Sequence, residues 1–210
     1  MESGREQNDE IKVIIIGDSG VGKTNLINTS IGINFLENNS TTVTSSFISK
    51  QFKIGDKKYN VNIWDTAGQE NYRSITKLFF KGSEIVILVY DITNSKTFDS
   101  LDFWYSTCQE IIGNEAVYGV IGNKIDLFVE EQVLEEEARK FAEEKKMPFA
   151  LVSAKDEPKG LEFFLKELIE EYYGLEDKDT KNESMKLDLK KEKVTEKKKN
   201  IVLDYLGEKF

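Results

Sequence analysis

The segment that most constrains this chain is residues 17–24, which read Gly-Asp-Ser-Gly-Val-Gly-Lys-Thr and fit the pattern G-x-x-x-x-G-K-[ST]. An apolar run at residues 11–16 precedes it and predicts a buried strand, and residues 24–30 predict a helix. A loop between a strand and a helix can direct several backbone N–H groups at one phosphate. The pattern therefore predicts that the chain binds a nucleoside diphosphate or triphosphate, with the Lys23 ammonium on the outer phosphates and the Thr24 hydroxyl as a Mg²⁺ ligand. The residues expected around the phosphates are Ser19, Gly20, Val21, Gly22, Lys23, Thr24 and Asn25.

Composition excludes several other classes of function. The 210 residues contain no histidine, which removes histidine-based acid–base catalysis, serine–histidine triads and histidine metal sites. Cys108 is the only cysteine, so we expect a reducing compartment and an ordinary core cysteine. The formal net charge of −9 argues against nucleic acid as a partner. Residues 1–10 are polar and unlike a signal peptide, and no apolar run has the length of a membrane span, so we expect a flexible N-terminus and a cytoplasmic protein.

Apolar runs of strand length alternate with amphipathic stretches from residue 11 to residue 174. The predicted strands are residues 11–16, 43–54, 57–64, 85–90, 117–121 and 149–152, and the predicted helices include residues 24–30, 97–112, 133–145 and 161–173. Gly55-Asp56 is a hairpin signal between the second and third runs. This order predicts an α/β fold: a six-stranded, mostly parallel sheet with one antiparallel hairpin strand and about five helices on both faces. Ligand loops should then lie at the carboxyl ends of the strands.

From residue 175 to residue 210 the chain becomes a charged tail that is too polar to bury a core of its own. We expect a solvated linker or a partly helical segment. The lysine-rich stretch at 190–199 leaves membrane attraction as the alternative. Residues 200–207 turn apolar again, and a docking helix, a stray apolar end and the start of a truncated second copy all remain open.

Three further segments separate guanine from adenine nucleotides. Asp65-Thr66-Ala67-Gly68 follows a predicted strand, where the Asp65 carboxylate would hold Mg²⁺ through water and the Gly68 N–H would meet a γ-phosphate. Asn123-Lys124-Ile125-Asp126 follows another strand, and the Asp126 carboxylate could accept two N–H bonds from guanine. Adenine would leave that carboxylate unpaired, at a cost of about 1–3 kcal/mol or more. Ser153-Ala154-Lys155 follows the last strand, where backbone N–H groups could meet the guanine O6.

With these motifs the chain resembles small GTPases of the Ras superfamily, and within it the Rab family, over residues 11–174. The most Rab-like stretches are residues 63–70, 72–76, 79–82 and 88–93. The resemblance implies a small G domain with a phosphate-binding loop that binds GTP and GDP with Mg²⁺ and slowly hydrolyses GTP. It also implies a role in vesicular traffic or related signalling, transient contact with endomembranes, and a monomer that meets effectors, exchange factors and GTPase-activating proteins.

The same resemblance implies several residue roles. Gln69 matches the glutamine that orients the attacking water, and Thr42 matches the threonine that binds Mg²⁺ and senses the γ-phosphate. Phe35 falls where the superfamily places an aromatic ring edge-on against guanine. Residues 34–49 and 68–76 would be the two switch segments. Phe47, Trp64 and Phe79 fall where Rab proteins keep an effector-facing aromatic triad, with ordinary core aromatics as the alternative.

The chain departs from the Rab pattern in several places, and two of these departures bear on its partners and its membrane attachment. Residues 42–47 read Thr-Val-Thr-Ser-Ser-Phe and lack the usual glycine and acidic residue, which puts the common effector and exchange-factor contacts in doubt. The chain ends without the cysteines that carry prenyl groups, so no stable lipid anchor is evident and the chain is either truncated, cytosolic or carried by a partner. These departures keep open a guanine-nucleotide-binding scaffold with little regulated hydrolysis. A P-loop ATPase or kinase is disfavoured by Asp126.

Overall fold

The computed structural model describes residues 9–37, 46–65 and 79–175. Within them one sheet contains six strands in the order β2-β3-β1-β4-β5-β6. The strands are β1 Asp9–Ile16, β2 Ser46–Ile54, β3 Lys57–Asp65, β4 Ile85–Asp91, β5 Val117–Asn123 and β6 Phe149–Val152. The α-helices are α1 Lys23–Ser30, α3 Ser95–Asp99, α4 Leu101–Ile112, α5 Glu135–Glu144 and α6 Gly160–Tyr173, and the short 3₁₀ helices are η2 Gly113–Glu115 and η3 Ile125–Glu130.

The sheet has the mixed topology that the sequence predicts. β2 and β3 form the antiparallel hairpin, and Gly55 occupies its turn with a φ of 56°. β1 pairs in parallel with β3 and with β4, and the parallel order continues through β5 to β6. Every residue of β4 is buried, as expected for a central parallel strand covered on both faces. The predicted fold class is therefore confirmed.

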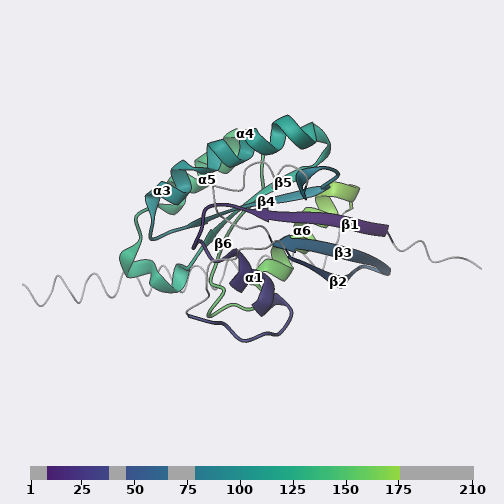
Figure 1. Ribbon diagram of the computed structural model, residues 1–210, viewed down its shortest axis with the longest axis horizontal. Coiled ribbons are helices and arrows are strands. Elements are labelled where there is room, and N and C mark those ends of the chain that lie inside the picture. The colour runs from purple at the N-terminus through teal and green to yellow at the C-terminus, as the bar shows by residue number, and fades with distance from the viewer. Residues whose placement is uncertain (1–8, 38–45, 66–78, 176–210) are drawn as a thin grey trace, which may run out of the picture. The chain divides into compact units, whose positions relative to one another are not determined.

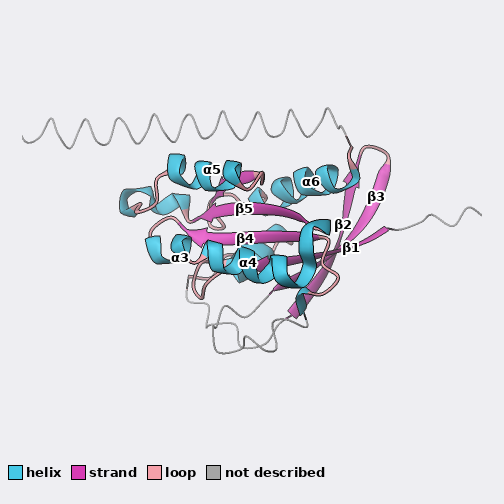
Figure 2. Cartoon of the chain, turned by 90° about the horizontal axis from the view of Figure 1, so that it is seen from above, coloured by secondary structure: helices cyan, strands magenta, loops and turns pink. Residues whose placement is uncertain are grey.

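Two hydrophobic clusters divide the core between the faces of the sheet. Alternate residues of β1 point to opposite sides, so Val13 and Ile15 join one cluster while Ile14 and Ile16 join the other. The first cluster includes side chains of α1 and α6, and the second includes those of α4 and α5. Figure 1 shows α3, α4 and α5 together on one side of the sheet and α1 and α6 on the other. Figure 2 views the sheet from the side of α4.

The predicted helix at residues 97–112 is divided in two. α3 ends at Asp99 and α4 begins at Leu101, with Ser100 between them. The Ser100 hydroxyl donates to the Lys96 carbonyl oxygen at 2.9 Å, and such back-bonding bends helices. The apolar spacing on which the prediction rests continues through this break, which is why periodicity alone does not reveal it.

Other boundaries differ by small amounts. α5 begins at Glu135 rather than at residue 133, because Leu134 keeps an extended backbone at the helix N-cap. Residues 43–45, predicted as the start of a strand, lie outside the described residues, and so does nearly all of the predicted tail. Cys108 is buried in the cluster under α4, and burial raises the pKa of its thiol to about 12, as expected for a core cysteine. None of the helices in the described ranges is both long and apolar enough to cross a membrane.

Candidate functional site

The predicted site residues that the structure describes meet at one edge of the sheet, because parallel strands place their carboxyl ends together. Gly17 follows β1, Asp65 ends β3 and Asn123 ends β5. In register, Ile15 lies opposite Asp65, and Asn123 lies opposite the last residue of β6. Segments that are far apart in the sequence thus converge on a single loop cluster.

The loop after β1 can be built only with glycine at two of its positions. A Cβ on Gly17, whose φ is 146°, would lie 2.1 Å from the Val89 carbonyl oxygen of the neighbouring strand. A Cβ on Gly22, whose φ is 97°, would lie 2.3 Å from Nδ2 of Asn123. Gly22 is also the N-cap of α1, so the loop ends where the backbone N–H groups of the helix are unsatisfied. The close approach of β4 and of Asn123 explains the glycines that the motif requires.

Lys23 lies at the start of α1 with only 5% of its surface exposed. Its ammonium donates to the carbonyl oxygens of Gly17 and Asp18, each at 2.8 Å. Burial lowers the pKa of Lys23 to about 8, and the nearby carboxylates of Asp65 and Asp18 oppose that shift. Two neutral carbonyls are weak partners for a buried ammonium, so an anion in the loop would stabilise its charge.

Thr24 and Asp65 are joined across the same loop. The Thr24 hydroxyl donates to Oδ2 of Asp65 at 2.8 Å. The other carboxylate oxygen, Oδ1, is buried and accepts no hydrogen bond from the residues that the structure describes. Burial raises the pKa of Asp65, an effect that the hydrogen bond from Thr24 and the charge of Lys23 oppose. A partly buried hydroxyl–carboxylate pair with one unsatisfied carboxylate oxygen fits a hard cation such as Mg²⁺.

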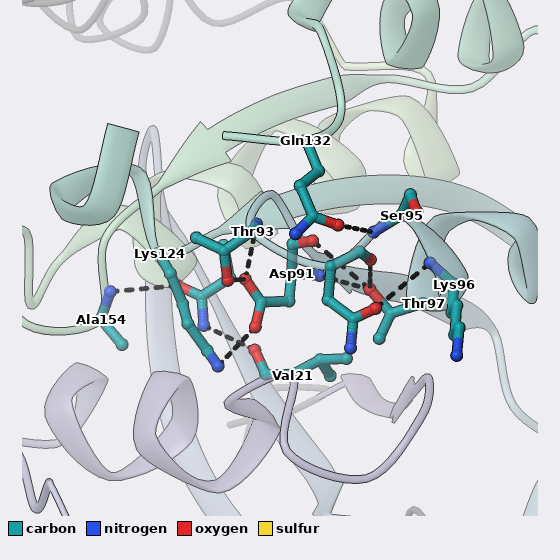
Figure 3. Close-up of polar contacts among 11 residues, drawn as sticks. Val21, Asp91, Thr93, Ser95, Lys96, Thr97, Lys124, Gln132 and Ala154 are labelled. Atoms are coloured by element: carbon teal, nitrogen blue, oxygen red, sulfur yellow. Dashed lines mark hydrogen bonds and ion pairs between the residues drawn. The ribbon is translucent and has the colours of Figure 1, made fainter. Parts of the chain in front are cut away.

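Asn123 connects the loop after β1 to the loop after β6. Its Nδ2 donates to the Val21 carbonyl oxygen at 2.8 Å, and its Oδ1 accepts from the Ala154 N–H at 3.2 Å. The side chain is almost fully buried, so both of its polar ends are satisfied by backbone groups of two distant segments. Figure 3 shows Val21 and Ala154 on either side of this connection.

The loop after β6 orients the side chain of Asp126. The Ser153 hydroxyl donates to Oδ1 of Asp126 at 2.6 Å, while its oxygen accepts from the Asp156 N–H at 3.0 Å. Lys124, two residues before Asp126, adopts a left-handed backbone with a φ of 71°, and η3 begins directly after it. The sequence predicts that Asn123, Lys124, Asp126, Ser153 and Ala154 share a site, and the structure brings them together.

A third part of the edge joins Lys155 to the segment after α1. Its ammonium lies 3.2 Å from Oε1 of Glu37 and 5.9 Å from the centre of the Phe35 ring. Nδ2 of Asn25 donates to the carbonyl oxygen of Leu36 at 3.0 Å, which attaches the same segment to α1. Phe35 and Lys155 are therefore neighbours, as expected if both border one base-binding pocket.

Three predicted residues, Thr42, Gly68 and Gln69, lie outside the described residues, so the predicted γ-phosphate and water contacts stay predictions. All three residues of the aromatic triad lie within the ranges that the structure describes. Its rings form a row in which Phe47 lies 5.1 Å and Phe79 lies 5.5 Å from Trp64, measured between ring centres. Phe47 is 57% exposed, which favours a surface role for the row over a core one.

The structure also reveals partners that the sequence reasoning missed. The indole N–H of Trp104 in α4 donates to Oδ1 of Asp18 at 2.8 Å, although 86 positions separate the two residues. Asp91, at the end of β4, pairs with Lys124 at 2.5 Å. Asp91 lies in a Rab-like stretch to which the sequence reasoning assigned no role. An acidic residue that closes a fully apolar central strand was the signal that could have identified it.

The chain is similar to known proteins over most of its length. The sequence model of the Ras family matches residues 12–173. The chain is 40% identical to Ras-related protein Rab-2B of Dictyostelium discoideum over 144 residues, which is 69% of this chain and 71% of that protein. It is 41% identical to Ras-related protein Rab-7a of Paramecium octaurelia, covering 69% of this chain and 73% of that protein. It is 38% identical to GTP-binding protein yptV5 of Volvox carteri, covering 70% and 75% respectively.

Proposed function

Because this chain belongs to the Ras superfamily and to its Rab family of small GTPases, we propose that it is a molecular switch of vesicular traffic, or of a related signalling task. Membership makes it a GTP-binding enzyme that hydrolyses GTP to GDP and phosphate. In the proposed role it is cytoplasmic and meets the cytosolic face of endomembranes transiently. Its partners are effectors, exchange factors and GTPase-activating proteins.

The base and the phosphates would be held by separate parts of the edge. Lys23 contacts the outer phosphates together with backbone N–H groups of residues 19–24. Asp126 accepts N–H bonds from guanine, and the Ala154 backbone lies near the guanine O6. Support for this division comes from Asn123, whose two hydrogen bonds hold the phosphate loop and the loop after β6 in one unit. That connection is the observation that carries the proposal.

Thr24 and Asp65 would hold Mg²⁺, together with Thr42 in the GTP state. When bound, Mg²⁺ neutralises charge on the phosphate oxygens. Gln69 orients the attacking water, and its neutral amide can both accept a hydrogen bond from water and donate one to the transferring group. The row of Phe47, Trp64 and Phe79, in which Phe47 is exposed and the other two are half-buried, would meet effectors.

Phosphate release from GTP tests the enzymatic part of this proposal. The purified chain is loaded with GTP and Mg²⁺, and release is followed in single turnover for the wild type and for Gln69→Leu. We expect slow release by the wild type and slower release by the variant, because leucine cannot orient water. Gln109→Leu on α4 is the matched control, since it makes the same substitution outside the site and should release phosphate like the wild type. Equal rates for the wild type and Gln69→Leu would favour a guanine-nucleotide-binding scaffold instead.

A further inference from the structure

We propose that Asp91 is a positioning residue of the base-binding site, which acts by holding Lys124 and, through it, the segment that carries Asp126. The proposal deepens the proposed guanine site and rests on it. Asp91 ends β4 and lies opposite Asn123 in the register with β5, so it stands beside the start of the base-reading segment, residues 123–132. It is 6% exposed.

The Asp91 carboxylate is held from two sides (Figure 3). Its Oδ1 accepts from the Thr93 N–H at 2.9 Å and from the Thr93 hydroxyl at 2.7 Å. Its Oδ2 lies 2.5 Å from the ammonium of Lys124. Thr93 therefore fixes the orientation of the carboxylate, and the carboxylate in turn fixes one end of the Lys124 side chain. A carboxylate that is bound in this way costs little conformational entropy when it pairs with a cation.

Lys124 needs such a constraint because its backbone is strained. Its φ of 71° and ψ of 35° lie in the left-handed region, which residues with a Cβ avoid. Its carbonyl oxygen accepts from the Leu127 N–H at 2.8 Å, which begins the turn of η3. The direction of η3, and with it the place of Asp126, thus follows from the conformation of Lys124. The ion pair with Asp91 helps to stabilise that conformation.

The turn after Asp91 also holds both ends of the base-reading segment. The Ile92 N–H donates to the Asn123 carbonyl oxygen at 3.2 Å, at the entrance to the segment. The Ile92 carbonyl oxygen accepts from the Gln132 N–H at 2.8 Å, at its exit, and Oε1 of Gln132 accepts from the Ser95 N–H at 3.3 Å. The Asp91 N–H itself donates to the Thr97 hydroxyl at 3.0 Å, which ties the turn to α3. One short turn therefore supports both ends of the base-reading segment.

The test measures release of fluorescent GDP and the relative affinities for GDP and inosine diphosphate, which lacks the exocyclic amine of guanine. Asp91→Asn removes the charge and keeps the shape. We expect this variant to release GDP about tenfold faster, which corresponds to a loss of about 1.4 kcal/mol of binding free energy. We also expect the preference for GDP over inosine diphosphate to become smaller by at least about threefold. The preference for GDP over inosine diphosphate depends on the alignment of Asp126 with the amine of guanine. A uniform loss of protein stability would not change this preference.

Two variants serve as comparisons. Asp102→Asn removes an exposed carboxylate that pairs with Lys145 at 2.9 Å, and it should match the wild type within about twofold. Thr93→Val removes one hydrogen bond to the Asp91 carboxylate and should shift both measurements in the same direction by less than Asp91→Asn. This milder variant keeps the test decisive if Asp91→Asn does not fold.

The outcomes separate this inference from the proposed function. If the wild type prefers GDP over ADP but Asp91→Asn and Thr93→Val release GDP like the wild type, the positioning role is wrong and the guanine site stands. The role is equally wrong if both variants weaken GDP and inosine diphosphate by the same factor. A wild type that does not prefer GDP over ADP would overturn both ideas.

Discussion

Replacing Gly22 with alanine should weaken nucleotide binding strongly, because the new Cβ collides with Asn123. A Cβ at this position would lie 2.3 Å from Nδ2 of Asn123, a side chain that is almost fully buried and hydrogen-bonded at both ends. The added methyl group must therefore displace the amide and break its bonds to Val21 and Ala154. Leaving buried backbone groups unpaired costs about 1–3 kcal/mol each, so the connection between the two loops loses about 2–6 kcal/mol.

Gly20→Ala is the matched control for this variant. Gly20 also has a positive φ, 81°, but nothing lies within 4 Å of the place where its Cβ would stand. Both variants carry the backbone strain of alanine in this region, about 1–2 kcal/mol, and only Gly22→Ala adds the collision. With about 1.4 kcal/mol for each tenfold change, the collision alone should weaken GDP binding by about 30-fold or more relative to Gly20→Ala.

The assay is calorimetric titration with GDP, accompanied by circular dichroism to show that each variant is folded. The expected order of affinity is wild type, then Gly20→Ala, then Gly22→Ala by a wide margin. If Gly22→Ala binds GDP within about threefold of Gly20→Ala, the connection through Asn123 does not support the site.

Three further predictions concern the same loop. Burial lowers the pKa of Lys23 to about 8, and bound phosphate would raise it, so GDP binding should take up protons above about pH 8. The affinity for GDP, measured by calorimetry, should therefore fall about fourfold from pH 7 to pH 8.5, and an affinity that rises with pH would contradict this. Trp104→Phe keeps an aromatic ring but removes the N–H that donates to Asp18, so GDP release should accelerate about three- to tenfold, and an unchanged rate would show that this bond does not support the loop. Thr24→Asn should weaken GTP far more than GDP in competition titrations with Mg²⁺, because the lost hydroxyl is a proposed Mg²⁺ ligand; equal weakening would reject that role.

Much of the fold was predictable because it follows from short-range patterns. The run that forms β4 is apolar throughout, and the Gly55-Asp56 turn stands between two β-rich runs, so the buried strand and the hairpin could be inferred from neighbouring residues. The meeting of the described candidate residues at one edge of the sheet was predictable for a related reason. Each ends a strand or follows one closely, and parallel strands bring such positions to one edge.

What escaped prediction depends on contacts between distant residues. The break at Ser100 leaves the helical spacing of apolar residues intact, so no periodic signal marks it. The bond between Trp104 and Asp18 and the pair of Asp91 with Lys124 join residues on different elements, and neither partner's neighbours in sequence indicate the other. Such pairs become visible only once the sheet places their elements together.

The central claim is that a carboxylate in the base-reading segment selects guanine. Its most direct test is competition between GTP and ATP for the purified chain with Mg²⁺. Adenine would leave the Asp126 carboxylate without its two N–H donors, so GTP should bind at least about 100-fold more tightly. Equal affinities for the two nucleotides would contradict the account.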